Sequence, residues 1–147
     1  MTDGSRLQLA VAGTISLAIG FLQFAMYFGG PEMYRWCGTP EPLVAFRVSR
    51  PVAALFVEVL LAAIFATFAA YAYSGAEIIR PLPWLAEGLV VTTVIYLLRG
   101  AFVIPQLIWR PAYGNTRDVL YSCIALAVGL AYGFPTYWHF LRAGWVR

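Results

Sequence analysis

The sequence predicts an all-α integral membrane protein, built as a four-helix transmembrane bundle with an extended first loop. Its composition indicates this class, because 61% of the residues are hydrophobic, only 12% are charged and the mean hydropathy is +0.73. Soluble domains carry roughly 25% charged residues. Four long apolar stretches follow one another within the 147 residues, and we expect them to form a single domain, 1–147.

The first expected helix spans 7–28, and about 22 residues are enough to cross a bilayer at ~1.5 Å per residue. No Ala-x-Ala-like cleavage site follows this apolar stretch, so we expect this helix to be retained. The extended loop follows over 29–50 and contains two turn signals, at 29–31 and 38–42. Between them, a short interfacial helix is expected over 32–36, with its aromatic side chains at the level of the lipid headgroups.

The second and third helices are expected over 51–73 and 84–109. Pro51 is compatible with the start of the second helix, since proline is tolerated in a first helical turn. Pro105 is expected to kink or fray the last turns of the third.

The fourth helix is expected over 118–140. It contains Gly129 and Gly133, a GxxxG step that is typical of a close packing face between membrane helices. We expect this face to lie against another helix, within the bundle or in a second copy of the chain.

Two charged residues lie deep inside the predicted helices, Glu58 in the second and Arg99 in the third. Counting helical rise from the loop side places them at comparable depth on consecutive antiparallel helices. Ionisable groups at that depth are costly and usually face the protein interior, so we expect the two side chains to interact. The remaining polar residues of the predicted cluster are Gln23, Tyr96, Gln106 and Ser122.

Three interpretations of this cluster stay open. Glu58 and Arg99 can form a structural ion pair, because a buried charge without its partner is strongly destabilising. They can instead form a ligand pocket in which Arg99 meets an anionic or carbonyl group and Glu58 positions it. Proton or ion transport through Glu58 is the third interpretation, and a nearby arginine argues against it because it would hold the carboxylate ionised.

Other reactive residues are few. Cys37, Cys123 and the single histidine, His139, show no metal-ligand spacing, so no metal site is expected. A disulfide between the two cysteines is conceivable if that side of the membrane is oxidising. His139 is expected to be an interfacial anchor. No basic run of the kind that binds nucleic acid is present.

The stretch Gly38-Thr39-Pro40-Glu41-Pro42, leading to a helix with an internal Glu58, resembles DoxX-like proteins. The segments 96–100 and 129–132 are also similar to small proteobacterial membrane proteins without an assigned role. The resemblance implies a four-helix protein of the bacterial inner membrane. Some DoxX-like proteins are associated with oxidoreductase or quinone chemistry.

Three functions are therefore considered, and none of them identifies a cofactor. The first is an accessory or ligand-binding membrane protein that holds a lipid- or quinone-like molecule, or a partner subunit, near Glu58 and Arg99. The second is a small membrane transporter, and the third is an enzyme of the microsomal glutathione-transferase type, whose charged signature is absent. We favour the first, in which the chain is active alone, as a homo-oligomer or with a membrane partner.

The distribution of basic residues does not decide the orientation of the chain. On the side of the termini lie Arg6, Arg80, Arg142 and Arg147, and on the loop side lie Arg35, Arg47, Arg50, Arg110 and Arg117. Because the two sides carry nearly equal numbers of arginines, the positive-inside rule does not predict an orientation. The short termini resemble the cytoplasmic ends of similar proteins, so both termini are expected in the cytoplasm.

Overall fold

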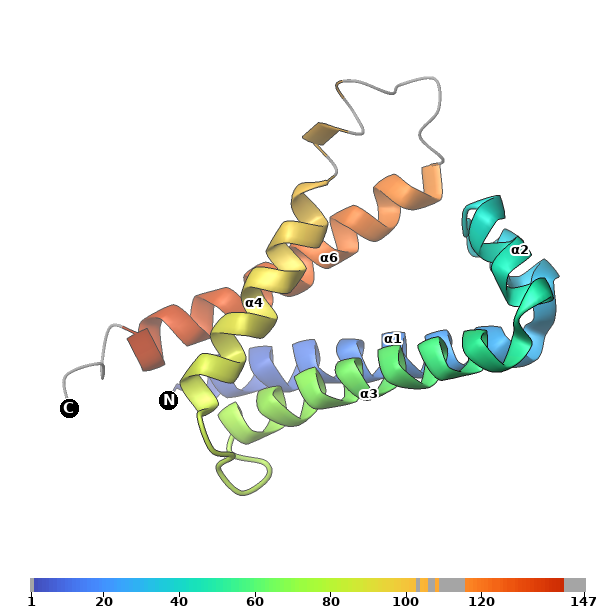
Figure 1. The fold of residues 1–147 in the computed structure, drawn as a ribbon. Coiled ribbons are helices and arrows are strands. Elements are labelled where there is room, and N and C mark those ends of the chain that lie inside the picture. Colours follow the sequence, from blue (N-terminus) through green and yellow to red (C-terminus); the bar gives the residue numbers. More distant parts are fainter. Residues whose placement is uncertain (1, 103, 106–107, 109–115, 142–147) are drawn as a thin grey trace.

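The structure is a computed structural model, and it describes residues 2–102, 104–105, 108 and 116–141. Every regular element in these ranges is helical and none is a strand, so the predicted all-α class is confirmed. The elements are α1 (Asp3–Trp36), α2 (Glu41–Ser49), α3 (Pro51–Gly75), α4 (Leu85–Ala101), α6 (Thr116–Thr136) and a π-helical turn, η1 (Tyr137–Leu141) (Figure 1). Three helical segments in this part of the chain are long and apolar enough to cross a membrane: α1, α3 and Val119–His139.

α1 consists of two helical segments joined at Gly30, and it extends beyond the single helix predicted over 7–28. Gly30 has φ 69° and ψ −171°, a backbone conformation that is essentially restricted to glycine. Pro31 follows at the start of the second segment, where a missing N–H breaks no helical hydrogen bond. The interfacial helix expected over 32–36 lies in this second segment.

The prediction of an extended first loop over 29–50 is wrong, because most of this stretch is helical. The prolines that suggested turns lie at helix starts instead. Pro40 is the N-cap of α2, Pro42 lies in its first turn and Pro51 is the first residue of α3. The chain bends between α2 and α3 at Arg50, whose φ of −135° and ψ of 67° interrupt the helix.

α4 ends at Ala101, well before the end predicted for the third helix at 109. Pro105 explains this end, since a proline ring collides with the carbonyl group four residues earlier, here that of Ala101. The other two expected helices agree more closely with the structure. α3 ends two residues beyond 73, and α6 with η1 covers the helix expected over 118–140.

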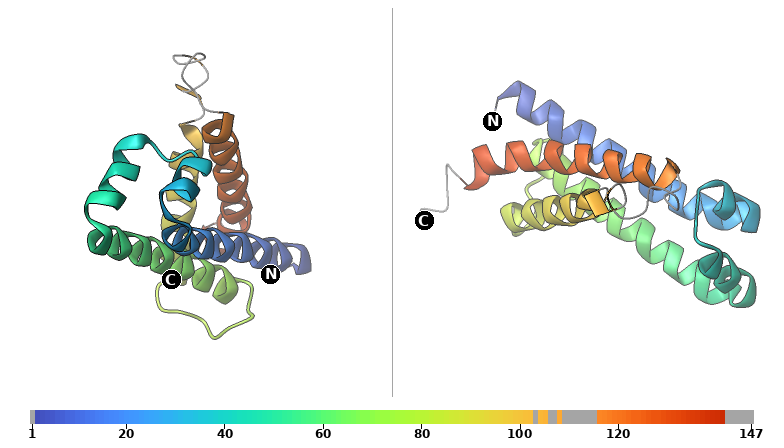
Figure 2. Two further views of the ribbon diagram at one scale, coloured as in Figure 1. Left: turned by 90° about the vertical axis from the view of Figure 1, so that its right-hand side faces the viewer. Right: turned by 90° about the horizontal axis from the view of Figure 1, so that it is seen from above.

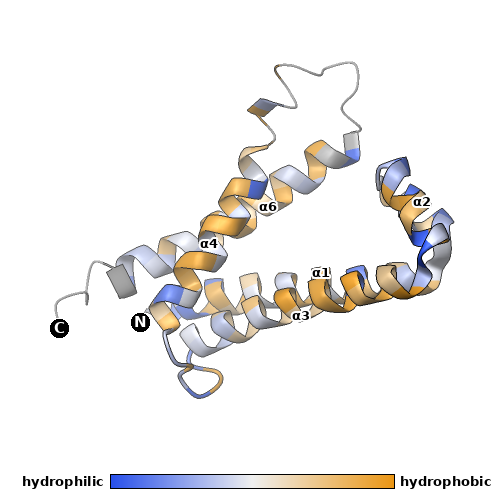
Figure 3. Ribbon diagram, in the orientation of Figure 1, coloured by the Kyte–Doolittle hydropathy of each residue, from blue (hydrophilic) through white to orange (hydrophobic). Residues whose placement is uncertain are grey.

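The helices form two pairs that meet at one end and diverge toward the other (Figure 1). α1 packs along α3 and α4 packs along α6, whereas contacts between the pairs are less extensive. The side view in Figure 2 shows α4 and α6 rising away from α1 and α3. Apolar residues dominate the long helices, and hydrophilic residues gather around α2 and the link between α3 and α4 (Figure 3).

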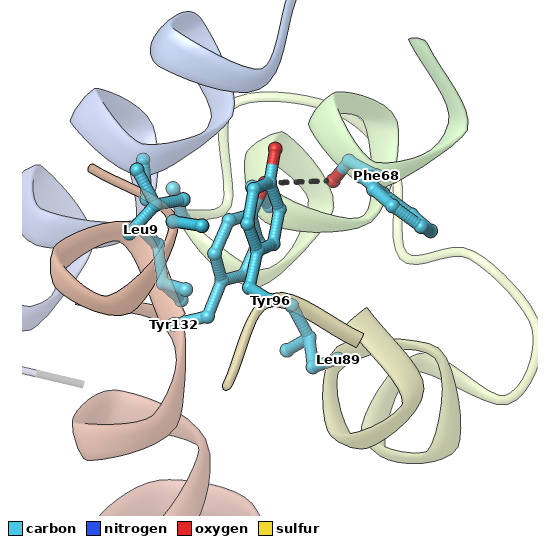
Figure 4. Close-up of a cluster of buried hydrophobic side chains, with 10 residues drawn as sticks. Leu9, Phe68, Leu89, Tyr96 and Tyr132 are labelled. Carbon is cyan, nitrogen blue, oxygen red and sulfur yellow. Dashed lines mark hydrogen bonds between the residues drawn. The ribbon is translucent and has the colours of Figure 1, made fainter. Parts of the chain in front are cut away.

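The two pairs share a hydrophobic core where they meet. Leu9 of α1, Phe68 of α3, Leu89 and Tyr96 of α4, and Tyr132 of α6 are all buried in one cluster (Figure 4). Every long helix contributes to it, so this end of the molecule is the one that holds the pairs together.

Candidate functional site

Glu58 is the one charged residue among those described that is buried, with 7% of its surface exposed. The Tyr34 hydroxyl donates a hydrogen bond of 2.7 Å to Glu58 Oε1. The second carboxylate oxygen, Oε2, is also buried and has no hydrogen-bond partner in the described part of the chain. A buried acceptor without a partner costs roughly 1–3 kcal/mol, so it calls for an explanation.

Arg47 of α2 completes this polar group. Its Nη2 donates to the main-chain oxygen of Tyr27 at 3.2 Å, and its guanidinium lies 4.2 Å from the centre of the Tyr27 ring. Its positive charge also acts on the Tyr34 hydroxyl. Arg47 Nε is buried and has no hydrogen-bond partner among the residues that the structure covers. We call Tyr34, Arg47 and Glu58 the Glu58 site, and it holds one unused donor and one unused acceptor.

The wall beside the Glu58 site is apolar and rich in sulfur. Met26, Tyr34, Cys37 and Val44 form a buried cluster, against which Met33 packs. Burial raises the pKa of the Cys37 thiol, and the positive charge of Arg117 opposes this only in part. The thiol is therefore protonated at neutral pH and is a weak nucleophile.

The local sequence explains how these side chains come together. The bend at Gly30 turns the last part of α1 and places Tyr34 against α3. Arg35 then links this segment to α2, because it bonds Glu32 at 2.7 Å and Glu41 at 3.0 Å. The Glu58 site is thus assembled from the kinked end of α1, from α2 and from the start of α3.

The structure does not bring Glu58 and Arg99 together, which corrects the predicted ion pair. Arg99 Nη1 donates instead to Ser122 Oγ of α6, at 2.8 Å. Helical rise gave the two residues similar depth along their helices, but it carries no information on lateral distance. The first part of α3, which contains Glu58, and the last turn of α4, which contains Arg99, belong to the ends of these helices at which the two pairs diverge (Figure 1).

The position of Arg99 in its helix removes the reason for an acidic partner. Because α4 ends at Ala101, Arg99 lies in the last helical turn and its side chain is exposed. A cation in a last turn interacts favourably with the helix dipole. A long arginine side chain near a helix end can also extend to the membrane surface.

Tyr96 belongs to a different polar group, where the two helix pairs meet. Ser16 Oγ lies 2.8 Å from the Tyr96 hydroxyl and 2.9 Å from the Tyr132 hydroxyl. The two tyrosine rings stack at 5.7 Å, and Tyr132 donates to the main-chain oxygen of Phe68 at 3.2 Å (Figure 4). We call these four residues the tyrosine junction, and they join α1, α3, α4 and α6.

Both predicted packing glycines face α4. A Cβ atom on Gly129 would lie 2.9 Å from the Leu97 side chain, and one on Gly133 would lie 3.0 Å from Thr93. Gly100 of α4 also lies at this close contact, because a Cβ atom on Gly100 would lie 2.6 Å from the backbone of α6. These contacts are within one copy of the chain.

The remaining predicted residues lie apart from the Glu58 site. Gln23 is half-buried on α1 and makes no hydrogen bond within the described ranges, and Gln106 lies outside those ranges. Cys37 and Cys123 are both free, so they do not form the conceivable disulfide. His139 Nε2 lies 2.9 Å from Ser5 Oγ, which ties the end of the last helix to the start of α1.

Sequence reasoning missed Tyr34 because it expected the aromatic side chains of 32–36 at the level of the lipid headgroups, and it missed Arg47 because that residue lies in the expected loop. No spacing in the sequence indicated them, because the helical register is interrupted at Gly30 and again between α1 and α2. Across the described residues, no three His, Cys, Asp or Glu side chains are grouped so that they could hold a metal ion. The chemistry available at the Glu58 site is hydrogen bonding to a molecule that offers both a donor and an acceptor.

Comparisons with protein-family models, with curated proteins and with solved structures find no match to this chain.

Proposed function

We propose that this chain is an accessory or ligand-binding protein of the bacterial inner membrane that holds a lipid- or quinone-like molecule in the Glu58 site. In this proposal α4 is the fourth membrane crossing, which makes the two helix pairs a four-helix transmembrane protein. The observation that carries the proposal is the buried Glu58 Oε2 without a partner, accompanied by the equally unpartnered Arg47 Nε.

The unused acceptor and the unused donor of the Glu58 site determine which chemical groups a ligand headgroup must carry. A hydroxyl group can donate to Glu58 Oε2 while it accepts from Arg47 Nε, and a carbonyl group can accept from Arg47. Quinols and quinones, and the glycerol part of many lipids, carry these groups. The apolar wall of Met26, Met33 and Val44 suits the hydrocarbon that adjoins such a headgroup. Thioether side chains adapt well to ligands of irregular shape.

Native mass spectrometry of the gently solubilised full chain tests this proposal. The wild-type protein is expected to retain a small amphiphile, whose mass identifies it as a lipid or a quinone. Glu58→Gln removes the negative charge and replaces one acceptor oxygen by a donor, so the bound mass is expected to be lost. Arg99→Gln is the matched control and is expected to retain it.

Two results would contradict the proposal. Retention of the same mass by Glu58→Gln and wild type would show that the ligand does not use this carboxylate. Loss of the mass in Arg99→Gln, but not in Glu58→Gln, would place the ligand at Arg99 and Ser122 instead. Thermal melting of each variant separates loss of ligand from loss of fold.

The orientation in this proposal places both termini in the cytoplasm. Alkaline phosphatase fused after the C-terminus is expected to be inactive, and the same enzyme inserted in the link between α1 and α2 is expected to be active. An active C-terminal fusion would reverse the orientation.

A small transporter is the second candidate, because Glu58 is a buried carboxylate with an unused acceptor oxygen inside a helix that is long enough to cross a membrane. Arg47 takes the place of Arg99 as the nearby cation that argues against proton transfer. Proteoliposomes that hold a pH-sensitive dye provide the test. Proton entry that depends on Glu58 would favour transport over simple binding, whereas equal leakage from wild type and Glu58→Gln would exclude it.

A further inference from the structure

A second surface of interest lies on α3, just beyond the bend at Arg50. Val52, Phe56 and Leu60 are four residues apart, so they form one stripe along the helix. Their exposed fractions are 76%, 79% and 59%. Because α3 is long and apolar enough to cross a membrane, this stripe is suited to contact with lipid chains.

The charged residue Arg50 lies at the N-terminal end of this stripe. Arg50 lines a shallow hollow together with Pro51, Val52, Ala53 and Phe56. The side chain of Arg50 makes no hydrogen bond or ion pair with any residue that the structure describes. An exposed guanidinium therefore adjoins an almost entirely apolar surface.

Most other arginines that the structure describes have a partner for their side chain, unlike Arg50. Partners are present for Arg6 (Glu77), Arg35 (Glu32 and Glu41), Arg47 (Tyr27), Arg99 (Ser122) and Arg117 (Trp36). Arg80 is the only other arginine in the described ranges without one, and it lies in the link between α3 and α4, away from this hollow.

The charge of Arg50 is not compensated by the acidic groups of the same end of the molecule. Glu32 and Glu41 are bound by Arg35, and Glu58 is buried beneath Tyr34. A guanidinium forms strong, often bidentate hydrogen bonds with phosphate oxygens. The hollow thus combines a site for a phosphate with an apolar track that leads away from it along the membrane.

We propose that an anionic phospholipid occupies this surface, with its phosphate on Arg50 and one acyl chain along Val52, Phe56 and Leu60. A net negative lipid is favoured over a zwitterionic one, because a zwitterionic headgroup adds a cation close to the guanidinium. This inference does not depend on a ligand in the Glu58 site.

Native mass spectrometry of the full chain in a mild detergent tests the inference with two probes of identical acyl chains, phosphatidylglycerol and phosphatidylcholine. Wild type is expected to retain phosphatidylglycerol about fivefold better, which is the usual worth of one basic residue near an anionic lipid. Arg50→Gln is expected to reduce this preference to about one. Arg80→Gln, the matched control, is expected to keep it.

Three results would overturn the inference: equal retention of both lipids by wild type, an unchanged preference in Arg50→Gln, or the same loss in Arg80→Gln as in Arg50→Gln. Displacement by glycerol phosphate as effective as that by phosphatidylglycerol would also overturn it, since the site would then bind a soluble anion. If Arg50→Gln does not fold, Phe56→Ser serves instead, because it is expected to weaken retention of phosphatidylglycerol. Undiminished retention in Phe56→Ser would show that the acyl chain does not follow the stripe.

Discussion

The tyrosine junction and the Glu58 site are both polar groups inside an apolar helical protein, but they differ in how fully their hydrogen bonds are satisfied. At the junction, the Ser16 hydroxyl lies within hydrogen-bond distance of the hydroxyls of Tyr96 and Tyr132, and Tyr132 donates to a main-chain oxygen. At the Glu58 site, one carboxylate oxygen and one guanidinium nitrogen are buried without a partner in the described chain.

The difference indicates different roles. A fully bonded polar group specifies one packing arrangement, and the junction does this at the point where the two helix pairs meet. A half-satisfied group makes the fold less stable unless something else supplies the missing bonds. The Glu58 site also depends on the bend at Gly30 and on α2, whereas the junction lies between long helices. We therefore assign stability to the junction, and the Glu58 site is the one for which we propose binding.

The largest effect is expected at the close contact between α4 and α6, two of the helices that carry the junction. Gly129→Leu places a side chain against Leu97, including its backbone nitrogen, and is expected to lower the free energy of unfolding by about 3 kcal/mol. Gly133→Leu meets only the Thr93 methyl group and is expected to cost less. Thermal melting in detergent measures both, with the exposed Leu130→Ala as control. An unchanged melting temperature of Gly129→Leu would show that α6 does not pack closely against α4 at this position.

The junction itself provides the second test. Ser16→Ala leaves the buried Tyr96 hydroxyl without its partner and is expected to cost about 2 kcal/mol of unfolding free energy. Thr67→Val is the control, because Thr67 is exposed and its hydroxyl bonds only the Ala63 carbonyl of its own helix. Equal melting of Ser16→Ala and Thr67→Val would mean that the junction adds nothing to stability.

The same contrast shows which features of the fold follow from sequence alone. Hydrophobic length predicts the long helices, and the GxxxG step of Gly129 and Gly133 falls on the face that meets α4. Prolines were harder to interpret, because the same residue type marks a turn or begins a helix. Pro40 and Pro51 begin helices, and Pro105 follows the end of one.

The candidate site could be predicted only in part. Glu58 was identifiable as a charge within an apolar helix, but its partner was not. Matching Glu58 with Arg99 used depth along the helix axis, which is the one coordinate that a sequence supplies. The angle between the helix pairs depends on packing at the tyrosine junction, and Tyr34 reaches Glu58 only because Gly30 redirects the chain. Both depend on tertiary structure.

Gly30 offers the third test, directed at the Glu58 side of the comparison. Gly30→Ala is expected to cost about 1–2 kcal/mol of unfolding free energy, because its φ of 69° and ψ of −171° strain any residue with a Cβ atom. A Cβ atom at Gly30 or at Gly4 would meet nothing within 4 Å, so Gly4→Ala is a control that differs in backbone conformation alone. Equal melting of the two variants would argue against the bend.

A smaller effect on stability is expected from Glu58→Gln, in contrast to Ser16→Ala. The glutamine keeps an acceptor for the Tyr34 hydroxyl, so the free energy of unfolding is expected to change by less than about 1 kcal/mol. The ligand, not the fold, is what this variant is expected to lose. A loss of stability as large as that of Ser16→Ala would place both polar groups in the same structural role.

The smallest effect concerns the exposed ion pair that links α2 to the end of α1. The hydrogen bond from Arg35 lowers the pKa of the Glu41 carboxyl below its ordinary value. At a pH above the ordinary pKa of a glutamate, the ion pair therefore makes its full contribution to the stability of α2. This contribution is lost as the pH falls through the lower pKa that Glu41 has in the folded state.

Amide hydrogen exchange of α2 measures this contribution, because weakly held segments open locally. Glu41→Gln is expected to exchange slightly faster than wild type at pH 7 in low salt. The difference is expected to disappear as the pH falls below the lowered pKa of Glu41, because the carboxyl is then protonated in wild type, and also in ~1 M salt, which screens exposed pairs. A difference that persists at both low pH and high salt would mean that Glu41 holds α2 by packing rather than by charge. In that case the cover of the Glu58 site would be as rigid as the tyrosine junction, and entry of a ligand would need another route.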